Sequence, residues 1–170
     1  MFDREIIITG EHSNKVKYLV NEAQIYSRYL DVYLNGVVIG LLYNQRQKKE
    51  ISVSETAKIF AEQVIGASEE LIFLYRLVML LDCSSNLTED ERIERAFKDD
   101  ALQDNQQKMK LNMELFNEYA NGGISILYDY LCKGNIELDS YIDTAYSLIK
   151  SFENQNNDSI EKEINEIIYQ

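Results

Sequence analysis

The chain contains no proline among its 170 residues and only seven glycines. Proline ends or kinks helices, because its ring fixes φ and it has no amide hydrogen to donate. Glycine is the other residue that commonly marks turns and helix ends. A chain with so few of either favours long helices over a succession of strands and tight turns. We therefore expect an all-α fold.

The spacing of the apolar residues supports this expectation. They recur every three to four positions in at least five segments, as they do on the buried face of a helix. We expect a single compact helical domain of about six or seven helices over residues 1–153, a polar linker at 154–158 and an amphipathic helix at 159–170. Residues 1–12 form either a short strand or an extended arm, and we favour the arm because no second strand is evident.

The individual helices are predicted from apolar periodicity and capping residues. Residues 26–44 and 71–81 are apolar on nearly every face, so both helices are expected at the centre of the core. Thr88 and Glu91 form a capping box, and Ser52 with Glu55 forms a second one that opens a helix through residue 64. The other helices are expected to begin near residue 13, to run over 104–133 with a kink or break at Gly122-Gly123, and to begin at residue 139.

Gly36 and Gly40 lie one turn apart within the first of the two central helices. Each glycine costs about 1 kcal/mol relative to alanine in a helix interior. A packing reason is therefore expected, and we predict that the two glycines face another helix closely. The second central helix contains Arg76, for which we expect a structural ion pair rather than substrate binding.

The last predicted helix carries one apolar stripe on an otherwise charged surface. Its members, at positions i, i+4, i+7 and i+8, are Ile160, Ile164, Ile167 and Ile168. A helix of this length is marginal in water on its own, so the stripe must dock. It docks either on the body of the same chain or, through the polar linker, in a groove of a partner or a second copy.

The charge of the chain excludes one broad class of partner. The formal net charge is −12, and it is +1 over residues 1–50, −6 over 51–100 and −7 over 101–170. Such a surface repels phosphate backbones, so direct nucleic-acid binding is not expected. The compact basic run Arg46, Lys48 and Lys49 is interpreted as a solvated loop. No apolar run reaches the roughly 20 residues that a membrane-spanning helix needs.

Few residues in the chain are suited to catalysis. His12 is the single histidine, and the two cysteines, Cys83 and Cys132, are far apart in the sequence. A serine nucleophile would have to use His12 beside Ser13, and we expect a capping or surface role for this pair instead. Neither the GxxxxGKS/T nor the GxGxxG phosphate-binding motif is present. We expect no cofactor.

Carboxylates are the remaining candidates for chemistry. Glu91 and Glu94 have the ExxE spacing with which helical hydrolases hold a metal ion. The second half of that pattern is missing, since Glu114 and Glu118 are each followed three residues later by asparagine. We interpret these acidic residues as a solvated helix face and expect no metal site.

The sequence therefore favours a non-catalytic subunit that binds other proteins within a cytoplasmic, bacterial multi-protein complex, such as a defence or mobile-element system. Two cysteines without a disulfide pattern, and no evident leader before residue 1, point to the cytoplasm. Binding is expected through the C-terminal helix or through a surface rich in the twelve tyrosines. The alternatives are an acidic DNA mimic that inhibits a nucleic-acid-binding protein and a carboxylate-metal-dependent hydrolase.

Overall fold

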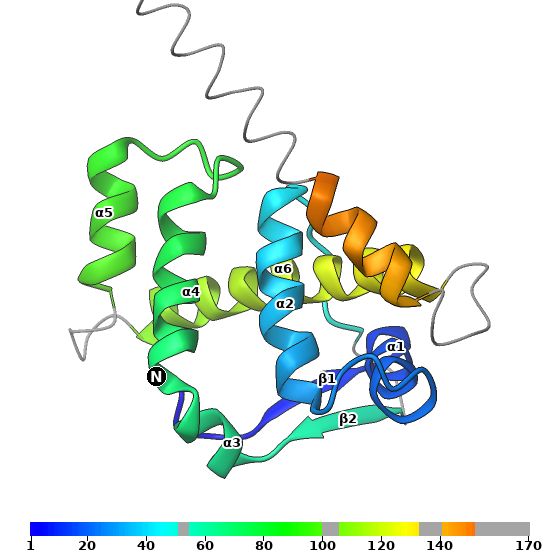
Figure 1. Ribbon diagram of the computed structural model, residues 1–170. Coiled ribbons are helices and arrows are strands. Elements are labelled where there is room, and N and C mark those ends of the chain that lie inside the picture. The colour runs from blue at the N-terminus through cyan, green and yellow to red at the C-terminus, as the bar shows by residue number, and fades with distance from the viewer. Residues whose placement is uncertain (51–54, 100–105, 133–140, 152–170) are drawn as a thin grey trace, which may run out of the picture. The chain divides into compact units, whose positions relative to one another are not determined.

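The computed structural model describes residues 1–50, 55–99, 106–132 and 141–151. These residues are mainly helical, which confirms the predicted fold class (Figure 1). In chain order the elements are β1 (Ile6–Thr9), α1 (Glu11–Lys17), the π-helical turn η1 (Tyr18–Glu22), α2 (Tyr29–Leu42), β2 (Thr56–Ile59), α3 (Ala61–Gly66), α4 (Ser68–Leu81), α5 (Glu89–Phe97) and α6 (Gln106–Cys132).

The chain divides into two units, residues 1–129 and residues 130–170. The first unit holds every labelled element except the last residues of α6. In the second unit, residues 141–151 are helical, where a helix was expected. The predicted linker at 154–158 and the amphipathic helix at 159–170 lie outside the described residues, so both stay predictions.

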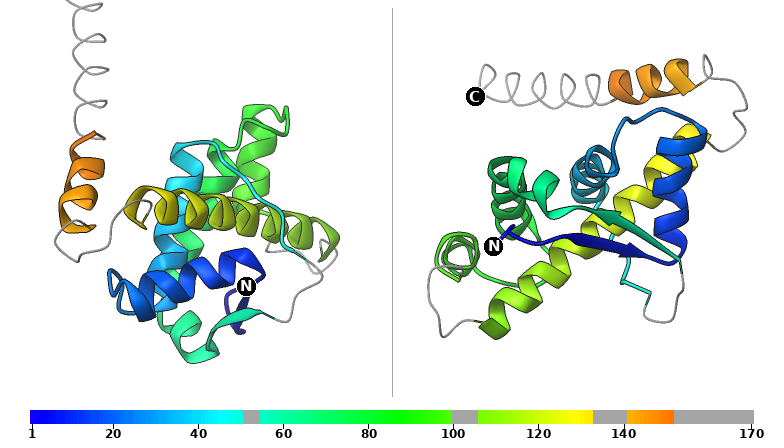
Figure 2. Two further views of the ribbon diagram at one scale, coloured as in Figure 1. Left: turned by 90° about the vertical axis from the view of Figure 1, so that its right-hand side faces the viewer. Right: turned by 90° about the horizontal axis from the view of Figure 1, so that it is seen from below.

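The N-terminal segment is a strand, and the preference for an unpaired arm was wrong. β1 pairs with β2 in an antiparallel ladder that places Ile6 opposite Ile59 and Thr9 opposite Thr56 (Figure 2). In β2, buried residues alternate with exposed ones, as the two-residue period of a strand requires. The predicted helix from Ser52 through residue 64 was therefore also wrong in its first half.

The start of α1 uses a local glycine and a distant carboxylate. Gly10 has φ of 67°, a left-handed conformation that glycine adopts without steric cost. The Ser13 hydroxyl donates to the Gly10 carbonyl at 2.8 Å, and the Glu11 amide donates to the Glu50 carboxylate at 3.3 Å. The positive end of this short helix is thus occupied by an acid of the same chain.

The helices α2 and α6 cross at four glycines. A methyl group on Gly36 would lie 2.8 Å from the Ala120 carbonyl oxygen, and one on Gly40 would overlap the Tyr119 carbonyl. From the other side, methyl groups on Gly122 and Gly123 would overlap the backbone at Gln45 and Gly36. The two backbones are therefore in direct contact. α6 continues as one helix through Gly122-Gly123, so these residues do not split it.

The predicted limits of α4 and α5 are close to those observed. α4 begins at Ser68, and one residue separates it from the end of the short helix α3. At the start of α5, the Glu91 amide donates to the Thr88 hydroxyl at 3.3 Å, and the Thr88 amide donates to the Glu91 carboxylate at 2.8 Å. This reciprocal pair is the predicted capping box. Figure 1 shows α5 beside α4 and α4 beside α2, with α6 crossing behind them.

Candidate functional site

One face of the first unit carries large apolar side chains at the surface. Phe73 at its centre is 64 % exposed, whereas Tyr75, two residues further along α4, is 1 % exposed. Val38 and Phe97 are also exposed, and the remaining members are half-buried. We call this surface the α4 face; it comprises Leu34 and Val38 of α2, Phe73, Leu77 and Leu80 of α4, and Phe97 of α5.

The α4 face arises because α4 is apolar on two sides. Its buried residues, at positions i, i+4, i+7 and i+8, are Leu71, Tyr75, Val78 and Met79. Phe73, Leu77 and Leu80 have the spacing i, i+4 and i+7 and form a second stripe beside the first. The helix contributes to the core as expected, but only one of its two apolar stripes is buried.

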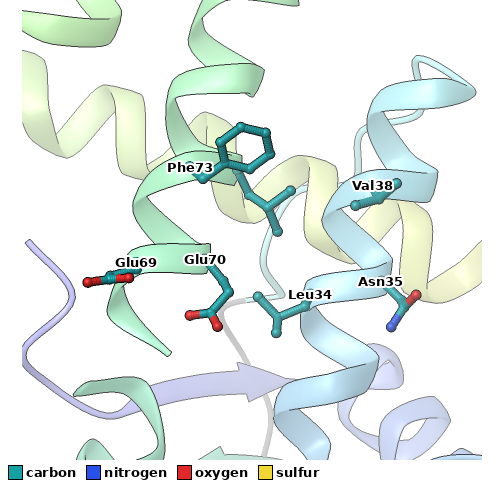
Figure 3. A pocket seen from close by; sticks show the side chains of 7 residues that line it. Leu34, Asn35, Val38, Glu69, Glu70 and Phe73 are labelled. Atoms are coloured by element: carbon teal, nitrogen blue, oxygen red, sulfur yellow. The ribbon is translucent and has the colours of Figure 1, made fainter. Parts of the chain in front are cut away.

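Two grooves flank Phe73. The first lies between α2 and α4, has a volume of about 500 Å³ and is walled by Leu34, Val38, Phe73 and Leu74 (Figure 3). The second lies between α4 and α5, has a volume of about 480 Å³ and is lined by Ile72, Phe73, Leu77, Leu80 and Phe97, with Glu69 and Arg76. Phe73 lines both grooves, so its side chain separates one from the other.

Charged groups lie at defined places along this face. Glu69 and Glu70 are exposed in the first turn of α4 and line the first groove. Arg76 lies two turns after Glu69 and lines the second groove. Its guanidinium carbon lies 5.1 Å from the centroid of the Phe97 ring, within the range of a cation–π interaction. The expected ion pair of Arg76 does not occur among the described residues.

The end of the α4 face is fixed by a buried carboxylate. Asp82 follows α4 directly and is fully buried. Its oxygens accept hydrogen bonds from the Ser84 hydroxyl at 2.6 Å, the Tyr119 hydroxyl at 2.9 Å and the Ser85 hydroxyl at 3.0 Å. Burial opposes the charged form of Asp82, but these hydrogen bonds outweigh that cost and lower its pKa to about 2. Asp82 is thus ionised at neutral pH.

Asp82 also joins three helices through Arg95. The Arg95 guanidinium of α5 is paired with Asp82 at 3.2 Å and donates from Nε to the Asn112 side chain of α6 at 2.7 Å. Asn112 in turn donates to Asp99 at 3.1 Å. This buried network holds α5 against α4 and α6. It therefore fixes one wall of the second groove.

His12 lies in a network of hydrogen bonds with Gln47, Ser125 and Lys15. The ring is buried, and its Nε2 lies 2.6 Å from the Gln47 side-chain oxygen, which also accepts a hydrogen bond from Ser125 at 2.8 Å. The Ser125 hydroxyl accepts a bond from Lys15 at 3.1 Å. Ser13, the neighbour of His12, is bonded to Gly10 instead. Both serines are buried, so no hydroxyl of this group is accessible to a substrate.

The acidic residues considered for a metal site have other partners. Glu91 belongs to the capping box of α5, and Glu94 is paired with Lys98 at 2.9 Å. Glu114 lies 4.0 Å from Lys110. In the part of the chain that the structure describes, no three His, Cys, Asp or Glu side chains gather in a way that could hold a metal ion. Nor does any described helix have the length and hydropathy needed to cross a membrane.

Several of the cysteine and tyrosine side chains are buried in the core. Cys132 is buried, which raises the pKa of its thiol to about 11, and Cys83 is exposed. Tyr33, Tyr75 and Tyr119 are among the largest fully buried side chains of the core. The exposed tyrosines of the described residues are Tyr43, Tyr130 and Tyr146, which lie on three separate segments.

The sequence-predicted site residues fall into two groups. Gly36 and Gly40 lie at the crossing with α6 described above. Ile160, Ile164, Ile167 and Ile168 lie outside the described residues, so their role in partner binding stays a prediction. The residues that the sequence analysis missed are Phe73, Phe97 and the two α2 residues of the α4 face. For Phe73 and the two α2 residues, the signal was the excess of apolar residues on helices 26–44 and 71–81, which is more than one core can cover. Phe97 lies outside both of these helices.

Comparison of the chain with models of known protein families, with curated proteins and with solved structures gives no match.

Proposed function

We propose that this protein is a non-catalytic binding subunit, and that it binds an amphipathic helix of another protein on the α4 face. The observation that carries the proposal is Phe73, a large aromatic side chain that is 64 % exposed between two apolar grooves. Protein interfaces are commonly dominated by a few aromatic anchors seated in or beside pockets. Because most of this ring is in contact with solvent, it buries little apolar area in the free chain.

The shape of the face fits a helix better than an extended peptide. Its two grooves follow α2 and α4 on one side of Phe73, and α4 and α5 on the other. An amphipathic helix presents apolar residues at i, i+3, i+4 and i+7, which enter such grooves as anchors. The two strands of the ladder, residues 6–9 and 56–59, do not line either groove.

The charge of the chain favours a basic partner over a second copy. The protein carries a formal net charge of −12, and Glu69 and Glu70 border the first groove. Two such surfaces repel each other, whereas a helix with flanking Lys or Arg residues is attracted. The bacterial, multi-protein setting expected from the composition remains part of this proposal, as does a role of residues 159–170 in the same complex.

The proposal is tested by capture from the native host with Phe73→Glu and a matched control, Leu111→Glu. Leu111 lies on α6, is 53 % exposed and lines neither groove. We expect Phe73→Glu to lose one protein that wild type and Leu111→Glu retain, and the purified protein to bind wild type through a helix with basic flanks. Equal capture by all three forms, or a wild-type dimer that Phe73→Glu dissociates, would refute the proposal.

A further inference from the structure

Arg76 lines the second groove together with Glu69, among otherwise apolar side chains. Its neighbours there are Phe73 and Leu77 of α4 and Phe97 of α5. The side chain is half-buried, and its Nε is shielded from solvent and has no hydrogen-bond partner. A buried donor without an acceptor is costly, more so when it carries charge. The free chain thus leaves a hydrogen-bonding requirement of Arg76 unmet.

The contrast with Arg95 shows what a satisfied arginine looks like in this fold. Arg95 donates from Nε to Asn112 and from one Nη to Asp82 and Ser85, and these bonds hold α5 in place. Arg76 has instead an aromatic ring against its guanidinium, 5.1 Å from carbon to centroid. Stacking on an aromatic face fixes the plane of a guanidinium while leaving its edge free to bind a carboxylate through two hydrogen bonds.

We propose that Arg76 is the charged anchor of the α4 face and binds the carboxylate of an acidic residue on the partner helix, whose neighbouring apolar residues fill the second groove. This inference rests on the proposed function. An acidic residue on an amphipathic helix suits this groove, because its carboxylate supplies the anionic partner that the Arg76 guanidinium does not have among the described residues, and its neighbouring apolar side chains fit the apolar walls.

The position of Arg76 also sets the direction of the partner helix. Arg76 follows Glu69 by seven residues on the same side of α4, which is about 10 Å along the helix axis. A partner helix that lies along α4 therefore presents a basic residue to Glu69 and Glu70 and an acidic one to Arg76, about two turns apart. Reversing the helix would bring like charges together, which disfavours the wrong orientation.

The carboxylate preference is measurable without the partner. We would titrate 4-phenylbutanoate and its uncharged analogue 4-phenylbutanamide into the full chain and follow the Arg76 Nε–H signal by NMR. The carboxylate is expected to bind about tenfold more tightly than the amide, as a charge-assisted hydrogen bond predicts, and to shift the Arg76 signal. Arg76→Gln should remove the preference, and Arg76→Lys should keep part of it.

Equal binding of the two compounds, or shifts that spare Arg76, would overturn the inference while leaving Phe73-dependent capture, and hence the proposed function, intact. The protein captured through Phe73 supplies the second arm. Its affinity should fall about tenfold with Arg76→Gln and stay unchanged with Leu111→Glu. The small carboxylate could bind more tightly than the amide in an Arg76-dependent way, while the affinity of the protein partner is unchanged by Arg76→Gln. In that case the groove binds a free organic acid, and the inference about the partner helix is wrong.

Discussion

The two sides of α2 differ in whether another part of the chain covers them. On one side, Gly36 and Gly40 let α6 approach until the backbones are in contact. On the other side, Leu34 and Val38 border a groove of about 500 Å³ next to Phe73. Both sides are apolar, so hydrophobicity alone does not distinguish them. The closed crossing stabilises the chain itself, whereas the open α4 face is available to another molecule.

The same contrast exists within α4, and it yields the largest expected difference. Tyr75 is buried and Phe73 is exposed, although both are aromatic and only two residues apart. We expect Tyr75→Ala to lower the free energy of unfolding by about 3–5 kcal/mol, and Phe73→Ala to change it by no more than about 0.5 kcal/mol. Chemical denaturation measures both. Comparable losses in the two variants would mean that Phe73 belongs to the core.

The stability of the network that holds α5, one wall of the second groove, is expected to depend on pH through the ionisation of Asp82. The pKa of Asp82 in the folded chain, about 2, lies below its ordinary value of 3.8. Ionised Asp82 therefore contributes stability above about pH 4, and this contribution is lost as the pH falls towards 2. Asp82→Asn should be less stable than wild type at pH 6 and should lose less on acidification. Parallel pH profiles of denaturation for the two proteins would contradict this role.

The closed crossing is tested by two identical substitutions at different glycines. A methyl group on Gly40 would overlap the Tyr119 carbonyl, whereas one on Gly66 would meet no atom within 4 Å. Gly40→Ala should cost about 1–3 kcal/mol through overpacking. Gly66→Ala should be neutral or stabilising by up to about 1 kcal/mol. If thermal unfolding of the two variants agrees within error, α2 and α6 are not in backbone contact.

The smallest effect on stability is expected from the C-terminal residues. Truncation after Glu153 removes the isoleucine stripe Ile160, Ile164, Ile167 and Ile168. If the stripe docks on a partner, the shortened chain keeps its melting temperature and binds its complex less tightly. A lowered melting temperature would instead mean that the stripe docks on its own chain. Differential scanning calorimetry with a pull-down separates these outcomes.

The helical fold was predictable because its signals are local. Thr88 and Glu91 mark the start of α5 through two hydrogen bonds between residues three apart. The strand β2 was not predictable in this way, since Ala57 and Phe60 also fit a helical spacing and the partner of β2 lies about 50 residues away. A ladder of four residues carries too short an alternation to outweigh that pattern.

The α4 face was only partly predictable for a related reason. The sequence shows that helices 26–44 and 71–81 are apolar nearly all round, but not which side each neighbour covers. The packing of α6 on Gly36 and Gly40, and of α5 through Arg95 and Asp82, decides that Phe73 stays exposed. Such choices depend on contacts between residues far apart in the sequence, which periodicity does not encode.

The most direct test of the central claim is site-specific photo-crosslinking in the native host. A benzophenone amino acid would replace Phe73 in one form of the full chain and Leu111 in the other, both of which are exposed. We predict that position 73 yields an adduct with one protein, mapped to an amphipathic helix with basic flanks, and that position 111 does not. Adducts of the same mass and amount at both positions, or a crosslinked dimer of this chain at position 73, would contradict the account.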